Sequence, residues 1–280
     1  MRVELHCHST CSDGSWAPEA VAEAAAGRDV RLFCLTDHDT MAGHPATAEV
    51  LGDGVVVLRG LELSCRVYAR TLHLLMYGVR EGEGRAQLQA RLDAVGEARR
   101  TRITAICEAL ARQGVELDPA PILAGAVGRT PGRPDVARAL VEEGVCTSPR
   151  EAFDRFLGDG KKAHIEVDRI TLEEGLSLGR ACGARMSLAH PHTMGSVDVV
   201  KELFREHREQ GLEGIEALYG RYARAEARPW LMLARELDLV VTGGSDFHGD
   251  MLPDVTRPVI DLDDAHARPL CEWLEVDVAA

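Results

Sequence analysis

Residues 32–39 read LFCLTDHD, an apolar run that ends at once in carboxylates and an imidazole. Such a run, closed by chemically capable residues, is typical of a buried strand whose carboxyl end carries function. The same pattern recurs at residues 3–8, 185–190 and 239–248. A helix is predicted over residues 17–26, with proline near its start and glycine after its end. The alternation of strands and helices predicts an α/β fold with a mainly parallel sheet or barrel.

The middle of the chain has a different pattern. Helical periodicity is predicted over residues 87–113, 136–143 and 150–157, and no strand-rich run occurs between about residues 84 and 161. We therefore expect a helical insertion at 84–161 within a barrel domain formed by 1–83 and 162–280. The strands expected in that domain cover residues 3–8, 32–36, 55–58, 62–65, 71–79, 185–189, 214–218 and 239–242, and its helices cover 17–26, 197–210 and 225–236.

Composition limits the possible partners. The 280 residues carry a formal net charge of −13, so binding to nucleic acid through a basic surface, and to duplex DNA in particular, is not expected. No stretch of 18 consecutive apolar residues occurs, so no membrane partner is expected either. Residues 97–165 have a net charge of +1, which leaves −14 for the rest. This segment is either a locally basic lobe that meets an anionic substrate or a set of solvated helix faces.

Eight cysteines are scattered along the chain without a disulfide pattern. Because the N-terminus shows no apolar export signal, we predict reduced thiols in the cytoplasm. Cys7 and Cys11 have a spacing found in structural zinc sites, but no second cysteine pair follows. In a strand, Cys7 would also point away from His6 and His8, so this rival site is not favoured.

Imidazoles and carboxylates recur at the predicted strand ends. Alternate residues of a strand share a face, so His6 and His8 can reach one ion. Mixed nitrogen and oxygen ligands suit Mn²⁺, Zn²⁺ or Fe²⁺ better than Mg²⁺ or Ca²⁺. A single histidine near a strand end is more often structural, as we expect for His44, His164, His207 and His266. The predicted metal ligands are His6, His8, Asp13, His38, Glu62, His73, His190, Asp246 and His248.

These segments resemble the PHP family, named for polymerase and histidinol phosphatase. The matching segments are HCHST and SDG (6–14), TDHD (36–39), GLELS (60–64), His73, AHP (189–191) and GSDFH (244–248). The resemblance implies a distorted (β/α)₇ barrel and two or three divalent ions. By position, His6, His8, Glu62 and Asp246 would hold the first ion. The second would be held by Glu62, His73 and His190, with Glu62 bridging, and the third by Asp13, His38 and His248.

The predicted insertion is similar to that of bacterial PHP phosphoesterases acting on nucleotides or short RNA. The similarity lies in residues 132–134 and 153–161. Two positions depart from that branch: His192 stands where an arginine is usual after Ala-His-Pro, and Asp135 stands where histidine often follows Arg-Pro. Arg133 is the best candidate for a phosphate clamp and Lys161 a second one, with a helix-end ion pair and a solvated lysine as their ordinary roles. His192 is a candidate substrate contact or general acid.

The function predicted from these residues is metal-dependent hydrolysis of phosphate monoesters by a hydroxide shared between ions. The expected partner is a small phosphorylated substrate, either a nucleotide (a monophosphate or a 3′,5′-bisphosphate) or the 5′ end of a short RNA. Histidinol-phosphatase-like activity and a non-catalytic metal-binding PHP scaffold stay open as alternatives. An amidohydrolase is less favoured because such barrels usually need a metal-bridging lysine at a strand end, and no lysine lies at such a position. Oligomeric state is not readable from the sequence.

Overall fold

A computed structural model describes the chain except residues 69, 127–130, 167–168, 252–253 and 279–280. The chain divides into two compact units: residues 1–89 with 170–280, here called the barrel unit, and residues 90–169, here called the helical unit. The predicted insertion bounds of 84 and 161 lie several residues before these divisions and stay a prediction. None of the helices in the described part of the chain is long and apolar enough to cross a membrane.

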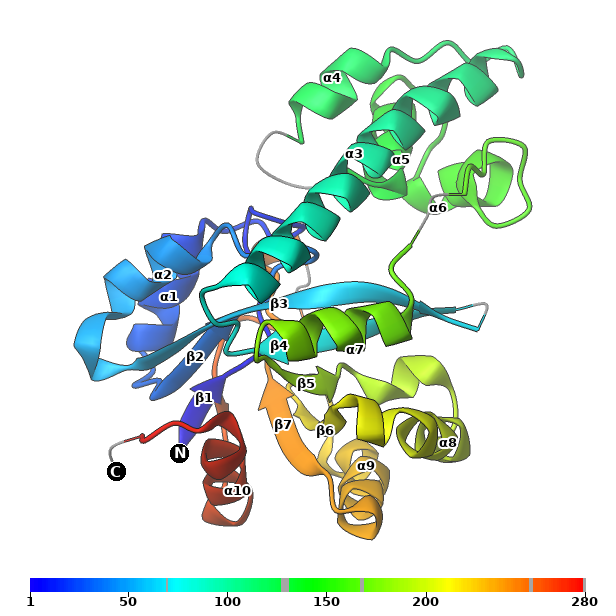
Figure 1. Cartoon of the computed structure of the whole chain (residues 1–280). Coiled ribbons are helices and arrows are strands. Elements are labelled where there is room, and N and C mark those ends of the chain that lie inside the picture. The colour runs from blue at the N-terminus through cyan, green and yellow to red at the C-terminus, as the bar shows by residue number, and fades with distance from the viewer. Residues whose placement is uncertain (69, 127–130, 167–168, 252–253, 279–280) are drawn as a thin grey trace. The chain divides into compact units, whose positions relative to one another are not determined.

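One sheet of eight strands forms the centre of the barrel unit, in the order β7-β6-β5-β4-β3-β2-β1-β8 (Figure 1). The strands are parallel at β1–β2–β3 and at β5–β6–β7. β4 is antiparallel to both β3 and β5, and β8 is antiparallel to β1. The strands are β1 (Arg2–Glu4), β2 (Leu32–Leu35), β3 (Val56–Val67), β4 (Arg70–Tyr77), β5 (Arg185–Leu188), β6 (Leu212–Tyr219), β7 (Val240–Gly244) and β8 (Ile260–Asp261).

The segments that follow β1 and β7 meet and bring the two sides of the sheet together. Cys7 forms a parallel bridge with Phe247, and the His8 amide donates to the Phe247 carbonyl at 2.8 Å. The Asp246 amide donates to the His6 carbonyl at 2.7 Å. Gly244 permits this approach because a Cβ there would overlap the His6 backbone. The predicted distorted (β/α)₇ barrel is confirmed, and the antiparallel β4 is one source of its distortion.

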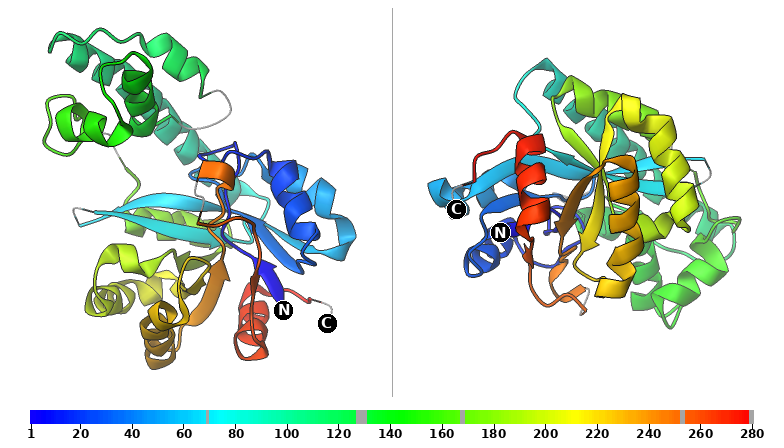
Figure 2. Two further views of the ribbon diagram at one scale, coloured as in Figure 1. Left: turned by 180° about the vertical axis from the view of Figure 1, so that it is seen from behind. Right: turned by 90° about the horizontal axis from the view of Figure 1, so that it is seen from below.

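Helices lie around the outside of this sheet (Figure 2). α7 packs against β3, β4 and β5, and α9 packs against β6 and β7. Proline at the first position of α1 and side-chain caps at Thr171 and Ser196 start three of the helices. These helices of the barrel unit are α1 (Pro18–Ala26), α2 (His44–Leu51), α7 (Leu172–Ala181), α8 (Val197–His207), α9 (Arg224–Leu237) and α10 (Asp264–Leu274). α2, α7 and α10 are not among the helices predicted from the sequence.

The helical unit has its own apolar core, formed by residues such as Ile106, Leu110, Val136 and Leu140. Its helices are α3 (Glu83–Ala111), which begins before the division at residue 89, α4 (Pro119–Ala124), α5 (Arg133–Glu142) and α6 (Pro149–Ala152). The helix predicted over 150–157 is only partly α-helical, because a π-helical turn covers Phe153–Leu157. The Gly158 amide, donating to the Phe153 carbonyl at 2.8 Å, closes this wider turn.

Candidate metal centre

The first two predicted ligands follow β1 and face the same side. His6 and His8 are fully buried, with ring centroids 5.3 Å apart. Cys7 between them points to the other side and joins an apolar cluster with Val21, Phe33 and others. The strand periodicity therefore holds past the end of β1, and Cys7 is a core residue rather than a partner of these imidazoles.

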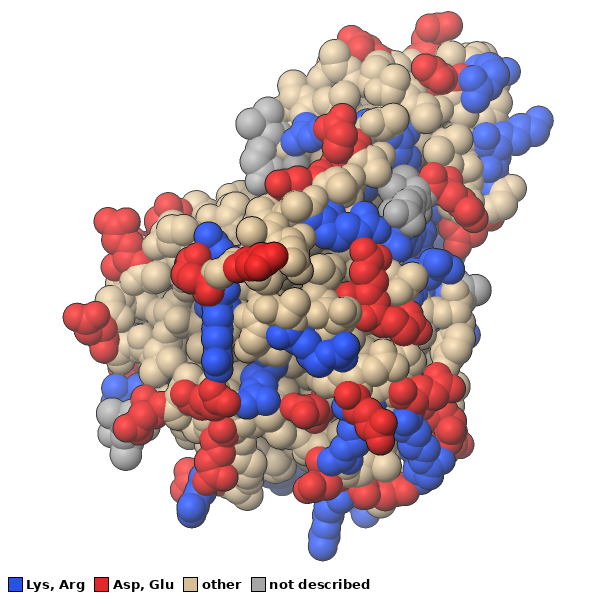
Figure 3. Space-filling view, in the orientation of Figure 1, with Lys and Arg blue, Asp and Glu red and all other residues tan. Residues whose placement is uncertain are grey.

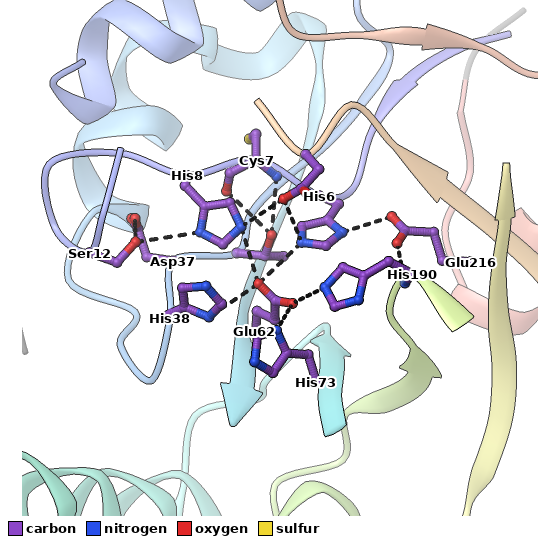
Figure 4. A network of polar contacts seen from close by, with 12 residues as sticks. His6, Cys7, His8, Ser12, Asp37, His38, Glu62, His73, His190 and Glu216 are labelled. Atoms are coloured by element: carbon purple, nitrogen blue, oxygen red, sulfur yellow. Dashed lines mark hydrogen bonds and ion pairs between the residues drawn. The ribbon is translucent and has the colours of Figure 1, made fainter. Parts of the chain in front are cut away.

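Glu62, on β3, lies at the centre of the site with 1% of its surface exposed (Figure 4). Its Oε2 atom lies 3.2 Å from His6 Nε2, 3.1 Å from His8 Nε2 and 3.2 Å from His38 Nδ1. Its Oε1 atom lies 2.8 Å from His73 Nδ1 and 3.0 Å from His190 Nε2. One carboxylate thus divides its two oxygens between two groups of imidazoles, as a bridging ligand would.

The remaining predicted ligands complete the cluster at one side. Asp246 Oδ1 lies 3.3 Å from both His6 Nε2 and His8 Nε2. Asp13 Oδ1 lies 3.4 Å from His248 Nε2, and Asp13 Oδ2 lies 3.7 Å from His38 Nε2. The rings of His8 and His248 stack with centroids 4.0 Å apart.

All of the predicted ligands fall into four overlapping groups whose potential ligand atoms lie within 4.8 Å of one another. The groups are His6 with His8 and Asp246; His6 with Glu62 and His190; His38 with Glu62 and His73; and His8 with Asp13, His38 and His248. The geometry brings together the residues that the family resemblance assigned to three ions. Which residue binds which ion stays a prediction.

The site fits divalent cations because several buried polar atoms lack hydrogen-bond partners. Among the described residues, His6 Nε2, His8 Nε2, His38 Nδ1 and Glu62 Oε2 are buried and make no hydrogen bond. Unsatisfied buried atoms are costly, so a cluster of them facing one another calls for a missing partner. A cation shared by these nitrogen and oxygen atoms would satisfy them together.

Electrostatics support the same conclusion. Burial alone would lower the pKa of His6, but the carboxylates of Glu216, Glu62 and Asp246 outweigh burial and raise that pKa well above its usual value. Burial would likewise raise the pKa of Glu62, yet His38 and the other imidazoles hold it well below its usual range. The buried carboxylates thus demand positive charge, which either protons or metal ions can supply.

Glu216 is not among the predicted site residues, yet it supports two of the predicted ligands. This carboxylate on β6 is fully buried. Its Oε1 atom lies 2.8 Å from His6 Nδ1, and its Oε2 atom accepts a hydrogen bond from the His190 amide at 2.7 Å (Figure 4). A lone carboxylate inside the otherwise apolar strand 214–218 was the available signal. Such partners orient metal-binding imidazoles and raise their basicity.

Two further side chains hold the loops that carry ligands. Tyr219, the last residue of β6, donates its hydroxyl to Asp246 Oδ2 at 2.6 Å and leaves Oδ1 facing the imidazoles. Asp37 accepts from the Ser9 amide at 2.7 Å and from the Ser12 hydroxyl at 2.6 Å. Asp37 thereby fixes the turn that follows His8 and carries Asp13.

The predicted substrate contacts lie in different places. His192 is exposed beside the metal centre, with its ring centroid 6.2 Å from that of His190. Arg133 belongs to the helical unit, where its Nη1 atom lies 2.9 Å from Asp159 Oδ1 and donates to the Leu157 carbonyl at 3.2 Å. Lys161 is an exposed residue of the same unit. The phosphate-binding roles of these three residues stay predictions.

Asp135, which departs from the pattern of the family branch, and His207, which was predicted to be structural, both have ordinary local roles. Asp135 caps α5, where its Oδ2 accepts from the Gly132 amide at 2.8 Å. His207 Nδ1 lies 3.0 Å from the Leu203 carbonyl. The four histidines predicted to be structural, namely His44, His164, His207 and His266, lie outside the four groups of potential metal ligands found among the described residues.

Comparison with known proteins places this geometry in a family. The PHP domain family matches residues 4–113. A phosphoribosyl 1,2-cyclic phosphate 1,2-diphosphodiesterase of Eggerthella lenta is 32% identical over 255 residues, which cover 89% of this chain and 95% of the relative. The chain belongs to the PHP family. The resemblance noted from the ligand segments is thereby confirmed.

Other PHP relatives align over nearly the whole chain. A 5′-3′ exoribonuclease of Haemophilus influenzae is 29% identical, covering 88% of this chain and 90% of the relative. A 3′,5′-nucleoside bisphosphate phosphatase of Chromobacterium violaceum is 28% identical, covering 92% and 94%. A solved structure from Bifidobacterium adolescentis, described as a metal-dependent phosphoesterase, is 25% identical with a TM-score of 0.77 and covers 97% and 96%. This PHP protein is a metal-dependent phosphoesterase, a hydrolase.

Proposed function

We propose that this PHP phosphoesterase hydrolyses phosphate monoesters of nucleotides, either monophosphates or 3′,5′-bisphosphates, or of the 5′ end of short RNA. The position of Glu62 is the observation that carries the proposal, because its two oxygens lie against five imidazoles at 2.8–3.2 Å. A buried carboxylate shared in this way is suited to bridge two ions. Bridged ions suit in-line displacement at phosphorus.

The proposed ligand assignment follows the clusters. His6, His8, Glu62 and Asp246 would hold a first ion, Glu62 with His73 and His190 a second, and Asp13 with His38 and His248 a third. Bound ions supply a nucleophilic oxygen at neutral pH and offset charge that develops on the phosphoryl oxygens. The ligand types accept Mn²⁺, Zn²⁺ or Fe²⁺.

The chain's own residues prepare the site. Glu216 orients His6 and the backbone of His190, and Tyr219 fixes Asp246. His192, exposed beside this centre, is placed to donate a proton to the leaving oxygen. Burial lowers the pKa of His192, so its imidazole is mostly neutral near pH 7 and must take up a proton before it can act as the acid. Arg133 and Lys161 complete the proposal as phosphate contacts.

Two alternatives are less well supported. A non-catalytic scaffold would be expected to have lost ligands, yet each ligand position of the family pattern is occupied by a suitable residue in this chain. A histidinol-phosphatase-like activity agrees less well with relatives named for nucleotide and RNA substrates. A cytoplasmic location belongs to the same proposal and is supported by eight free cysteines.

The proposal is tested by phosphatase assays on metal-stripped protein before and after Mn²⁺ is added back. The panel contains nucleoside monophosphates, 3′,5′-bisphosphates, 5′-phosphorylated short RNA, a cyclic phosphodiester and histidinol phosphate. We expect activity to vanish with the metal, to return with Mn²⁺ and to favour the nucleotides or RNA. Activity that survives chelation, or that is highest on histidinol phosphate, would overturn the proposal.

A further inference from the structure

A cavity of ≈ 580 Å³ opens next to the metal centre, and all of its lining residues belong to the barrel unit. It lies between the turn that follows β5 and the segment that leads from β6 into α9. We call it the aromatic cavity because His192, Tyr219, Tyr222 and Trp230 line it, together with Arg221 and others. Small-molecule sites in proteins usually have volumes of roughly 300–1,000 Å³, so the cavity is large enough for a nucleoside.

Two lining residues connect the cavity to the proposed ligands. Tyr219 lines the cavity and donates its hydroxyl to Asp246. The ring of His192 lies 6.2 Å from that of His190 and 5.6 Å from that of Tyr219. If the phosphorus of a substrate lies at the metal centre, the alcohol part of the ester would therefore reach the cavity.

The rings in the cavity form a connected set. Tyr222 lies 5.0 Å from Tyr219 and 5.3 Å from His192, measured between ring centroids. The Tyr222 hydroxyl oxygen lies 2.8 Å from His192 Nδ1, which fixes the two rings relative to each other. Trp230 is buried behind them, whereas His192 is exposed and Tyr222 is half-buried. An exposed ring held rigidly beside a reaction centre is a stacking surface prepared before a ligand arrives.

The charge of the cavity also suits a nucleotide. Arg221 lines the cavity and its Nη2 atom lies 3.2 Å from Asp254 Oδ2 at the surface. Guanidinium groups stack on aromatic faces and attract phosphate oxygens. Glu226, the acidic residue in the lining, is engaged by the Ala223 amide as a helix cap. An aromatic lining with an arginine at its edge fits a base and sugar attached to an anionic group.

We propose that the aromatic cavity binds the nucleoside part of the substrate, with the base stacked on the ring of Tyr222, which stands at 71° to the ring of His192. This inference rests on the proposed function and adds to it the surface that distinguishes a nucleotide from other phosphate esters. Base stacking on an aromatic side chain accepts every base, so the cavity selects for a base rather than for one sequence.

The test compares kcat/KM for adenosine 3′,5′-bisphosphate with that for ribose 5-phosphate, which lacks a base. We expect Tyr222→Leu to lower the ratio of the two values by about tenfold, as the loss of one stacking ring does. Tyr222→Phe keeps the ring and loses the contact with His192, so it should keep the ratio. Tyr68→Leu, an exposed tyrosine at the β3–β4 hairpin, is the matched control and should also keep it. An unchanged ratio in Tyr222→Leu overturns the inference.

A binding measurement separates this inference from the proposed function. Adenosine, which has no phosphate, is titrated by saturation-transfer NMR into metal-stripped wild-type and Tyr222→Leu proteins, both checked for folding by circular dichroism. Saturable binding that is lost in Tyr222→Leu supports the inference about the cavity, even if no nucleotide is hydrolysed. The absence of hydrolysis would overturn only the proposed function. Equal adenosine signals in both proteins reject the cavity even if nucleotides are hydrolysed.

Discussion

The charged side chains at the centre of the barrel unit differ from those of the helical unit in their burial and in their partners. In the barrel unit, Glu62, Asp246 and their imidazole neighbours are buried against one another, and several of their polar atoms have no hydrogen-bond partner among the described residues. In the helical unit, charges pair near the surface, as in Arg133 with Asp159 and Arg155 with Glu151. On the face seen in Figure 3, Lys and Arg side chains likewise lie among Asp and Glu side chains rather than in a separate patch.

The difference shows where the fold gives up stability for function. Exposed ion pairs contribute roughly 0–1 kcal/mol each and are easily replaced. A buried group of unpaired acceptors destabilises the chain unless a ligand completes it. The barrel unit is therefore expected to respond strongly to changes at the cluster and to metal. The helical unit should respond weakly to most single changes of charge.

The largest expected effect is that of Glu62→Gln. The amide keeps the shape of the side chain but replaces one oxygen that faces imidazoles with an NH₂ donor. We expect kcat to fall by more than about 100-fold, beyond the usual cost of changing a residue that only supports a ligand. Metal content and Mn²⁺-dependent phosphatase assays measure the effect. Glu81→Gln, an exposed carboxylate paired with Arg59, is the control. A Glu62→Gln variant with ordinary turnover would mean that the reaction occurs elsewhere.

Most of the residues that cluster at the site could be predicted to do so because they carry a local signal. His6 and His8 alternate at the end of a strand, and Asp37, His38 and Asp39 follow a strand directly. Local patterns of this kind require only that strand ends meet at one edge of the barrel. Glu216 and Tyr219 carry no such pattern. Their importance depends on contacts with residues 26 to 210 positions away, which only the folded chain reveals.

The predicted bounds and direction of two strands were wrong for a similar reason. Two short strands were predicted at 55–58 and 62–65, whereas β3 runs without interruption from Val56 to Val67. Gly60 lies inside this strand, at a point where a Cβ would overlap the Met76 backbone of β4. The antiparallel direction of β4 also escaped prediction, since apolar periodicity is the same for a strand in either direction.

Glu216→Gln is expected to have the next largest effect. A carboxylate can face His6 Nδ1 and accept from the His190 amide at the same time, whereas the amide group has only one acceptor oxygen. One of the two ligands should lose its support. We predict a loss of about 10- to 100-fold in metal affinity or activity, seen as a shifted Mn²⁺ activation curve. Glu213→Gln, on the same strand but contacting Trp273, is the matched control and should leave the curve unchanged.

Metal binding should also depend on pH. Burial alone would lower the pKa of His8, but the carboxylates of Asp246 and Glu62 beside its Nε2 atom outweigh burial and raise the pKa to about 10. Below that pH the imidazole carries a proton that an incoming ion must displace. Affinity should therefore rise with pH, by about tenfold per unit for each proton released.

Calorimetric titration with Mn²⁺ in buffers of different ionisation enthalpy counts the released protons near neutral pH. A His266→Gln variant, which changes a histidine paired with Asp263 on the surface, should release the same number as the wild type. Binding heats that do not depend on the buffer would contradict this account of the cluster.

The smallest effect tests Arg102, a helical-unit residue with buried polar atoms that lack hydrogen-bond partners among the described residues, as at the barrel site. Arg102 Nε and Nη2 are buried and make no hydrogen bond among the described residues. Burial, followed by the nearby guanidinium groups of Arg133, Arg169 and Arg99, lowers the pKa of Arg102 to about 10. Replacing a poorly solvated charge by an apolar side chain of similar length removes that cost and keeps the packing of the stem.

We therefore expect Arg102→Met to raise the unfolding temperature by about 2–4 °C in phosphate-free buffer, which corresponds to roughly 1 kcal/mol in a chain of this size. Differential scanning calorimetry of the metal-loaded protein measures the shift, with Arg150→Met as the control because that arginine is almost fully exposed. A fall of the same size would show that Arg102 has a stabilising partner. In that case the Arg102 guanidinium is paired like the other charged groups of the helical unit, and the contrast with the barrel unit would be complete.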